Sequence, residues 1–280
     1  REVASLTVPA GYAVGLVAPA CSYLLPDIKP LDIYVSTGTN GDGSQSNPYP
    51  IACQQDIDAV NNDLTAHYVM TADIYLSQNR EYKTSPIAAD DPDIYSGDPE
   101  FSGLFDGGNH KIASLTIRGK SYCGLFGRID SATITGVGIE DCSINGLDYL
   151  GGLCGLADNS AGNTVITDCH STGTMSGSQY VGGLCGKITD YTVSDAEMVS
   201  CFADCDVSGS YFIGGLCGHS IATIEQCYAK GNVSGLSQVG GLCGANDRQV
   251  NNSYAAGSVT GDGSEVGGLC GRNWGTINNS

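Results

Sequence analysis

Cysteines are the residues of this 280-residue chain with the greatest chemical potential, and there are thirteen of them. Cysteine sulfur can form disulfides, ligate zinc or hold an iron–sulfur cluster. Metal and cluster sites usually carry close pairs such as Cys-x-x-Cys, and the nearest pair here is Cys201-x-x-x-Cys205. Five cysteines instead recur at one position of a repeated block, in steps of 31, 32, 26 and 27 residues: Cys154, Cys185, Cys217, Cys243 and Cys270.

A position that recurs once per repeat stacks on itself when the repeats stack, so these sulfurs should align at roughly the 4.8 Å spacing of neighbouring strands. We favour buried thiols that act as small hydrophobic side chains. Disulfides between stacked cysteines, or between the two blocks of a repeat, are the alternative, although parallel Cβ vectors would strain them. A metal column is a third possibility. The second block adds three further cysteines: Cys169, Cys201 and Cys227.

Acidic side chains gather at two places where they could bind calcium weakly. Asp90, Asp91 and Asp93 crowd one loop, followed by further acidic residues, and Asp42 lies in a glycine-rich turn. Carboxylate oxygens suit calcium, but neither run matches an EF-hand or the nonapeptide calcium repeat. A solvated acidic loop is the favoured interpretation, and calcium is the one cofactor that stays open.

Residues that could catalyse a reaction show no recognised arrangement. The four histidines form no His-Glu-x-x-His motif, and we interpret His219 as a surface turn residue. Basic residues in the second half are few and scattered through the sequence, and no nucleophile elbow or phosphate loop is present. We therefore predict that the protein is not an enzyme.

Glycine punctuates the sequence that positions these cysteines. Segments such as Tyr180-Val-Gly-Gly-Leu-Cys-Gly186 and Phe212-Ile-Gly-Gly-Leu-Cys-Gly218 alternate with a second block such as Gln226-Cys-Tyr-Ala-Lys-Gly231. A unit of this length cannot bury its own apolar face, but stacked units share one core. The pattern predicts an all-β fold, a right-handed parallel β-helix. Either Leu or Cys of each block could face the core, and outward leucines would form an apolar stripe for lateral association.

The two alternating blocks resemble the GLUG repeats of bacterial surface proteins, over roughly residues 121–280. The resemblance implies a parallel β-helix in a surface protein, such as an adhesin. This chain departs from that pattern because Cys stands where the repeats usually carry Val.

Three regions are expected along the chain. Residues 1–30 form an apolar, strand-like segment that packs on its own cap or on a neighbouring subunit. Residues 31–120 contain the cap and first coils, with an amphipathic helix from Ile51 to Leu64 that closes the open end. Residues 121–280 form the repeat β-helix, which continues or stays open at its C-terminal end.

Composition narrows the range of partners. A net charge of −18 disfavours nucleic acids, and no stretch could span a bilayer because glycine and proline interrupt the apolar N-terminal segment. We therefore predict a secreted or cell-surface structural or adhesive protein that binds a host or neighbouring cell surface, or self-associates, for example head-to-tail into a filament or surface fibre. The alternative is a β-helix that binds or cleaves extracellular polysaccharide. A cleft lined by Asp, Lys and aromatic residues on one flank would favour that alternative.

Overall fold

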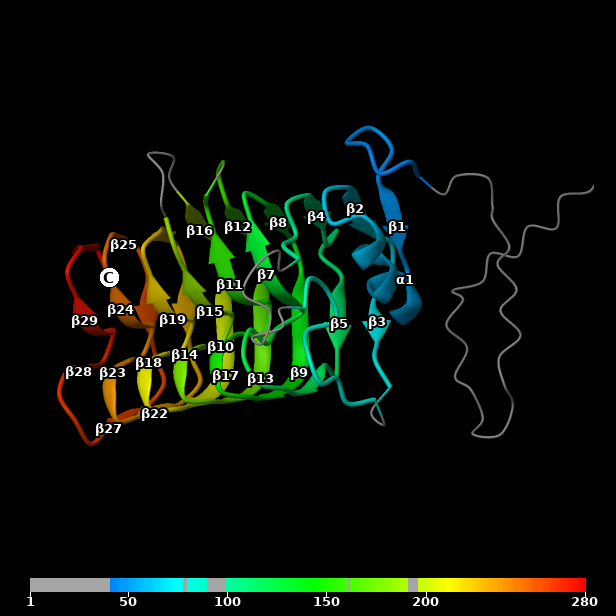
Figure 1. Ribbon diagram of the computed structural model, residues 1–280. Coiled ribbons are helices and arrows are strands. Elements are labelled where there is room, and N and C mark those ends of the chain that lie inside the picture. The colour runs from blue at the N-terminus through cyan, green and yellow to red at the C-terminus, as the bar shows by residue number, and fades with distance from the viewer. Residues whose placement is uncertain (1–40, 78–79, 90–98, 161, 191–195) are drawn as a thin grey trace, which may run out of the picture.

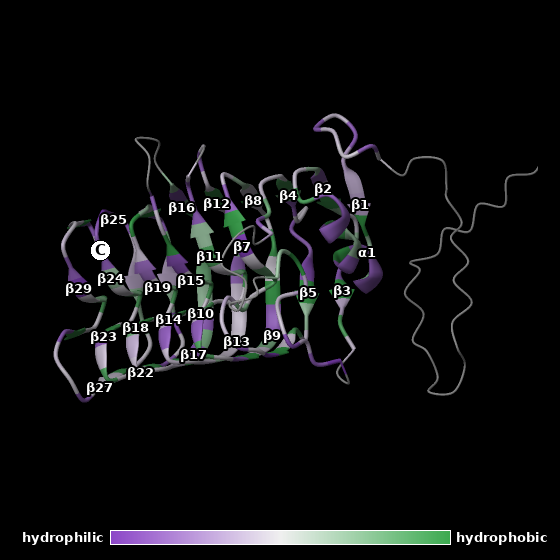
Figure 2. Cartoon of the chain, viewed as in Figure 1, coloured by the Kyte–Doolittle hydropathy of each residue, from purple (hydrophilic) through white to green (hydrophobic). Residues whose placement is uncertain are grey.

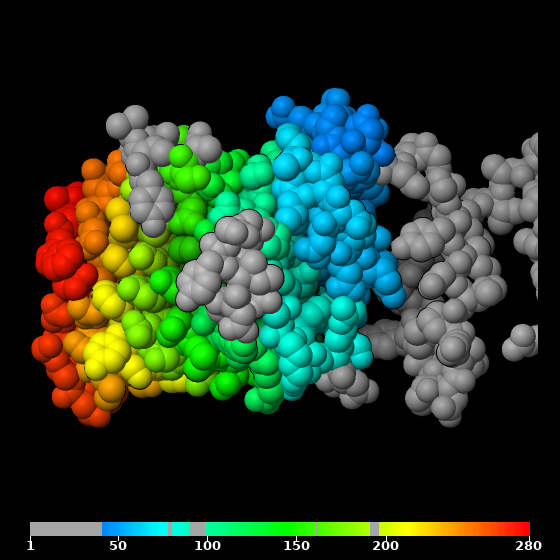
Figure 3. Space-filling view, in the orientation of Figure 1, coloured from blue at the N-terminus to red at the C-terminus, as the bar shows by residue number. Residues whose placement is uncertain are grey.

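The computed structural model describes residues 41–77, 80–89, 99–160, 162–190 and 196–280. Its strands form four parallel sheets that wind into one β-helix, so the predicted all-β solenoid is confirmed (Figure 1). Each coil lies directly beside the next along the axis, as the successive colour bands of Figure 3 show. The N-terminal segment of residues 1–30 and the acidic loop residues Asp90, Asp91 and Asp93 lie outside the described residues.

The nine-stranded sheet runs the whole described length. Its strands follow the order β1 (Tyr49–Ile51), β2 (His67–Met70), β4 (Leu104–Asp106), β8 (Thr133–Thr135), β12 (Val165–Thr167), β16 (Glu197–Val199), β20 (Thr223–Glu225), β25 (Gln249–Asn251) and β30 (Thr276–Asn278). In the repeat region the central residue of each strand points inward. Ile134, Ile166, Met198, Ile224 and Val250 are direct register partners in succession, and all are buried.

The ten-stranded sheet forms a second face. Its strands are β3 (Ile74–Tyr75), β5 (Lys111–Ala113), β6 (Thr116–Arg118), β9 (Gly138–Asn145), β13 (His170–Ser176), β17 (Phe202–Ser208), β21 (Tyr228–Ala229), β22 (Val233–Gly235), β26 (Tyr254–Ala255) and β27 (Val259–Gly261). Burial alternates along β17, where Ala203, Cys205 and Val207 are buried and the residues between them are exposed. This period of two is expected of a strand with one face in the core. Figure 2 shows the resulting alternation of apolar and polar residues around each coil.

Two shorter sheets complete the coil in the repeat region. The five-stranded sheet contains β10 (Asp148–Leu150), β14 (Gln179–Gly182), β18 (Tyr211–Gly214), β23 (Ser237–Gly240) and β28 (Val266–Gly267). The six-stranded sheet contains β7 (Phe126–Asp130), β11 (Cys154–Asp158), β15 (Cys185–Ile188), β19 (Cys217–Ser220), β24 (Cys243–Asn246) and β29 (Cys270–Asn273). The Gly-Gly-Leu segment forms the bend between these two sheets.

That bend needs glycine because neighbouring coils come into backbone contact there. A Cβ built on Gly214 would lie 2.7 Å from the backbone nitrogen of Gly244, closer than real side chains approach. The residue two positions before the Gly-Gly pair also has an unusual conformation. Tyr149, Tyr180 and Phe212 have φ values of +60°, +54° and +58°, in the left-handed region that bulky residues rarely adopt.

The N-terminal helix is shorter than predicted. α1 spans Gln54–Ala59 and continues as a 3₁₀ turn, η1, at Val60–Asn62, so a helix from Ile51 to Leu64 was wrong at both ends. Ile51 instead belongs to β1, where it pairs with Met70 of β2. Ile57 and Val60 point into the core and are completely buried. α1 lies beside the first coils at the N-terminal end of the described solenoid (Figure 1).

The outward leucine stripe is not what the structure shows. Leu153, Leu184, Leu216 and Leu242 are completely buried, and so are the cysteines that follow them. Each leucine belongs to the bend and each cysteine begins the next strand, so strict strand alternation does not apply between them. Both side chains therefore enter the core.

Candidate functional site

The repeated cysteines form two columns in the structure. Cys154, Cys185, Cys217, Cys243 and Cys270 are direct register partners along the six-stranded sheet. The sulfurs of Cys154 and Cys185 lie 3.2 Å apart, within hydrogen-bond distance, and are not joined by a disulfide. Burial raises the pKa of Cys185 and Cys243 well above the usual value for a thiol. A buried thiol of this kind is a poor nucleophile and a poor metal ligand, because both roles require the thiolate.

The second column contains Cys169, Cys201 and Cys227 at the corner before the ten-stranded sheet. The backbone N–H of Cys169 donates to the sulfur of Cys201, and the N–H of Cys201 donates to that of Cys227, each over 3.4 Å. Ser253 and Ser280 continue the column with hydroxyl oxygens in the same role. These sulfurs therefore satisfy backbone groups between coils. That both columns stay reduced in the native protein remains a prediction.

The described residues contain no group of three or more His, Cys, Asp or Glu side chains that could hold a metal ion. The one member of the predicted calcium sites within the described part is Asp42. Its carboxylate accepts the backbone N–H of Ser44 over 3.0 Å, and the contacts of Ser44 lower the pKa of Asp42. Weak calcium binding at the loop of Asp90, Asp91 and Asp93 stays a prediction.

Two aromatic columns follow the axis on the surface. In the first column, Tyr122, Tyr149, Tyr180 and Phe212 stack with ring centroids 4.6, 4.8 and 4.7 Å apart. In the second, His170, Phe202, Tyr228 and Tyr254 stack at 4.7, 4.9 and 5.1 Å. Stacked rings cover one another's faces and present their edges to solvent. Because the edge of an aromatic ring carries partial positive charge, such a column favours anions over sugars that would stack on ring faces.

Beside the first aromatic column lies a set of residues that we call the basic strip. It is the register position two residues after the first residue of each strand of the six-stranded sheet: Arg128, Leu156, Lys187, His219, Ala245 and Arg272. The amine of Lys187 lies 5.0 Å from the ring of Tyr180, and the guanidinium of Arg272 lies 5.3 Å from that of Phe212. Basic residues that are scattered in the sequence are therefore gathered on one flank, which corrects our interpretation of them.

His219 is a buried member of this strip, and its interpretation as a surface turn residue was wrong. Its residue exposure is 8%, and its Nε2 lies 2.9 Å from Oδ2 of Asp247 in the next coil. Burial lowers the pKa of His219, so the neutral ring donates from Nε2 and leaves Nδ1 as an acceptor. Its ring also packs 5.4 Å from the ring of Phe212. Sequence reasoning missed this site because the partners are 28 residues apart.

Three buried polar atoms at this place have no hydrogen-bond partner within the described structure. They are Nδ1 of His219, Oδ1 of Asp247 and Nε of Arg272. Two are acceptors and one is a donor, and unpartnered buried polar atoms are costly and rare in folded proteins. Nearby, Arg248 reaches back two coils to the buried carboxylate of Asp190 over 2.6 Å. The flank thus combines cations, carboxylates and ring edges.

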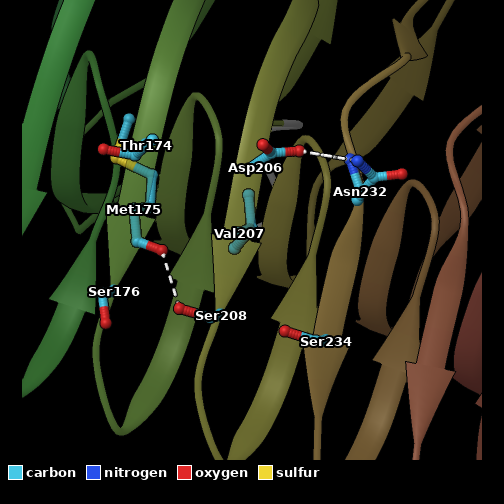
Figure 4. A pocket seen from close by; sticks show the side chains of 8 residues that line it. All are labelled: Thr174, Met175, Ser176, Asp206, Val207, Ser208, Asn232 and Ser234. Atoms are coloured by element: carbon cyan, nitrogen blue, oxygen red, sulfur yellow. Dashed lines mark hydrogen bonds between the residues drawn. The ribbon is translucent and has the colours of Figure 1, made fainter.

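A shallow hollow of about 280 Å³ lies elsewhere, on the ten-stranded sheet (Figure 4). Eight residues from β13, β17 and the β21–β22 region line it: Thr174, Met175, Ser176, Asp206, Val207, Ser208, Asn232 and Ser234. The carboxylate of Asp206 accepts both the backbone N–H and the side-chain amide of Asn232 over 3.0 Å. Asp206 is the one carboxylate among these eight described residues, so the hollow lacks the paired carboxylates that glycoside hydrolysis uses. Its lining includes four side-chain hydroxyl groups beside Asp206.

Comparison with known proteins identifies the repeat. A GLUG motif matches residues 209–234, which confirms the resemblance to GLUG-repeat proteins. Halomucin from Haloquadratum walsbyi is 33% identical over 145 residues, which are 49% of this chain and 2% of halomucin. The chain thus matches a very small part of that relative's length.

A solved structure shares the architecture. A Bacteroides ovatus protein, provisionally described as an immunoglobulin A1 protease, superposes with a TM-score of 0.61 at 21% identity, over 86% of this chain and 80% of that one. At this identity the likeness shows the fold alone. No described helix is both long and apolar enough to cross a membrane.

Proposed function

We propose that this GLUG-repeat parallel β-helix is a rigid, non-catalytic segment of an extracellular surface protein, with a structural or adhesive role. The observation that carries the proposal is the registered stacking of identical side chains from coil to coil, in the thiol columns and the first aromatic column. Such columns stabilise a long, regular shape and do not require a unique chemical site. The similarity to halomucin supports a surface location.

Surface exposure tests this function directly. Intact cells of the source organism would be treated with a protease that cannot enter them, and peptides of residues 41–280 would be followed by mass spectrometry. We expect their release from intact cells while a cytosolic marker protein stays uncut. Peptides that appear only after lysis would contradict the proposal.

Self-association is a finer part of the proposal. Parallel coils pair through the edges of their strands, and strand edges can pair with a second chain in the same way. Light scattering on the purified chain across a concentration series should show a mass that rises above 28.8 kDa. A constant monomer mass up to high concentration would remove self-association and leave the rigid-segment role intact.

The hollow of Figure 4 favours a second candidate function, binding of a neutral polysaccharide. Thr174, Ser176 and Ser234 offer hydroxyl groups around the fixed carboxylate of Asp206, a combination that suits sugar hydroxyls. Binding of neutral oligosaccharides that is lost in Asp206→Ala and retained in Asp204→Ala would support this candidate. Equal binding by both variants would exclude the hollow as the binding site.

A further inference from the structure

We propose that the basic strip around Lys187, His219 and Arg272 binds an acidic polysaccharide, with its sugar carboxylates on the two cations. This site is separate from the hollow of Figure 4 and goes beyond the structural role proposed above. The distribution of charge is the first observation that supports it. The chain carries a net charge of −18, yet four of the five basic residues in residues 121–280 lie in or beside this strip: Arg128, Lys187, Arg248 and Arg272.

Two of these cations are in no direct ion pair among the described residues, although the carboxylates of Asp158 and Asp247 act on Lys187 from further away. Arg128 pairs with Glu100 and Asp158, and Arg248 pairs with Asp190. Lys187 and Arg272 make no ion pair with any residue that the structure describes. The guanidinium of Arg272 instead packs on the ring of Trp274, 3.6 Å from its centroid, and the amine of Lys187 lies 5.0 Å from the ring of Tyr180. Burial lowers the pKa of Lys187, so an incoming anion would stabilise a charge that is now poorly solvated.

Arg272 reaches toward the same place from two coils away. It belongs to β29, while Phe212, which its guanidinium approaches, precedes the bend before β19. The intervening position of the strip is Ala245, whose small side chain leaves room for this reach. The cation is therefore held near His219 by a partly exposed residue whose guanidinium also packs on Trp274.

The unpartnered atoms indicate which anion fits. Nε of Arg272 donates, whereas Nδ1 of His219 and Oδ1 of Asp247 accept. All three atoms are buried, so a ligand meets them only when these side chains turn outward. A ligand that then satisfied all three would carry acceptors and hydroxyl donors together, as a uronic acid polymer does. The phosphate backbone of DNA supplies acceptors but no hydroxyl donor, so it cannot meet the two acceptor atoms. The strip follows the axis with cations at three of its six positions, which suits an extended polymer that carries charges along its length.

Titration calorimetry on the full chain can test the site with an oligogalacturonate of defined length and its fully methyl-esterified form. We expect the acid form to bind at low salt, and the esterified form to bind at least tenfold more weakly. Lys187→Gln and Arg272→Gln should each weaken binding about tenfold. The matched control is Lys230→Gln, which removes the same charge from a lysine 4.8 Å from Tyr228 in the second aromatic column and should change binding less than twofold.

His219→Gln extends the test, because it removes the imidazole and its Nδ1 acceptor from the site. This substitution should weaken binding of the acid form of the oligogalacturonate and leave the unfolding midpoint close to that of the unsubstituted chain. Absence of binding at millimolar probe would overturn the proposal. An equal loss of affinity in Lys230→Gln would also overturn it, because the attraction would then depend on the total charge of the chain and not on the basic strip. Tighter binding of polyglutamate than of oligogalacturonate would assign the strip to an acidic protein partner and would also overturn it. None of these outcomes bears on surface exposure.

Discussion

The first coils and the repeat coils share one architecture but fill their cores differently. The completely buried phenylalanines, Phe101, Phe105 and Phe126, all lie in the first coils, where they form an irregular cluster with Tyr68 through tilted and edge-on ring contacts. After Phe126 the core consists of registered columns of aliphatic residues, methionine and cysteine, and the aromatic rings of the repeat coils lie at the surface in parallel stacks. An irregular aromatic cluster therefore packs the N-terminal end of the β-helix, and the repeat coils extend the β-helix from it.

Alkaline pH should separate the two regions most strongly. Burial raises the pKa of Cys185 and Cys243, so these thiols keep their protons in the fold while the unfolded chain ionises. Their contribution to stability is complete below about pH 9 and is lost as pH rises through the folded pKa, at about 1.4 kcal/mol per thiol and pH unit. In the first coils burial raises the pKa of one thiol, Cys123, to about 12. Burial also raises the pKa of Tyr68 and Tyr82 to about 12, so these tyrosines act only above about pH 10.

Hydrogen exchange at pH 8, 9 and 10, corrected for intrinsic rates, would measure this difference. We expect the repeat coils to lose protection before the first coils. A variant with valine at all five positions of the first thiol column, Cys154, Cys185, Cys217, Cys243 and Cys270, should lose much of the effect. Full protection of the repeat coils at pH 10, together with fewer titratable thiols after denaturation, would indicate disulfides instead of buried thiols.

Core truncation should be the next largest effect. Phe105 is completely buried and lies 5.4 Å from Phe126 and 6.3 Å from Tyr68, measured between ring centroids. Phe105→Ala should therefore cost about 3–5 kcal/mol of unfolding free energy. Cys217→Ala removes one sulfur from a column and should cost about 1 kcal/mol. Urea unfolding compares the two, and similar losses would mean that the irregular cluster has no special role.

A methyl group at the repeat bend should cost somewhat less. In Gly215→Ala, at the second glycine of the Gly-Gly pair, the new Cβ would meet the backbone carbonyl oxygen of Gly241 in the next coil. Overpacking against backbone should cost about 3 kcal/mol. Gly268→Ala is the matched control in the last coil, since no described atom lies within 4 Å of the position that its Cβ would occupy. Equal stability of the two variants would show that the coils separate easily at the bend.

The sequence predicts the columns because their residues recur at one repeat position, and the register of Cys185 with Cys217 is a direct consequence. It does not reveal His219 beside Asp247, since proximity across coils depends on register and the two belong to different segments. A usable signal was nevertheless present. Lys187, His219 and Arg272 each follow a repeated cysteine by two residues, so counting from the block would have aligned them.

The burial of both Leu184 and Cys185 could not be predicted from strand alternation, because the structure places a bend at one and a strand at the other. The spacing of apolar residues from Ile51 to Leu64 also could not predict the length of α1. Ile51, Ile57 and Val60 share a helical spacing, yet Ile51 pairs with Met70 in a strand. The pairing of Ile51 with a strand that is distant in sequence determined its conformation, and the local spacing of apolar residues gives no information on such pairing.

The smallest predicted effect concerns the surface stack that distinguishes the repeat coils. Tyr149 lies between Tyr122 and Tyr180, at 4.6 and 4.8 Å, and has a φ of +60°. Tyr149→Ala should cost about 1 kcal/mol through lost ring contacts. Tyr149→Gly loses the same contacts but removes the left-handed strain, about 1 kcal/mol, and should be nearly neutral. Thermal unfolding of both variants measures the difference. If Tyr149→Gly is less stable than Tyr149→Ala, the backbone at this position is not strained. In that case the ring stack does not offset any strain in the left-handed conformation of Tyr149.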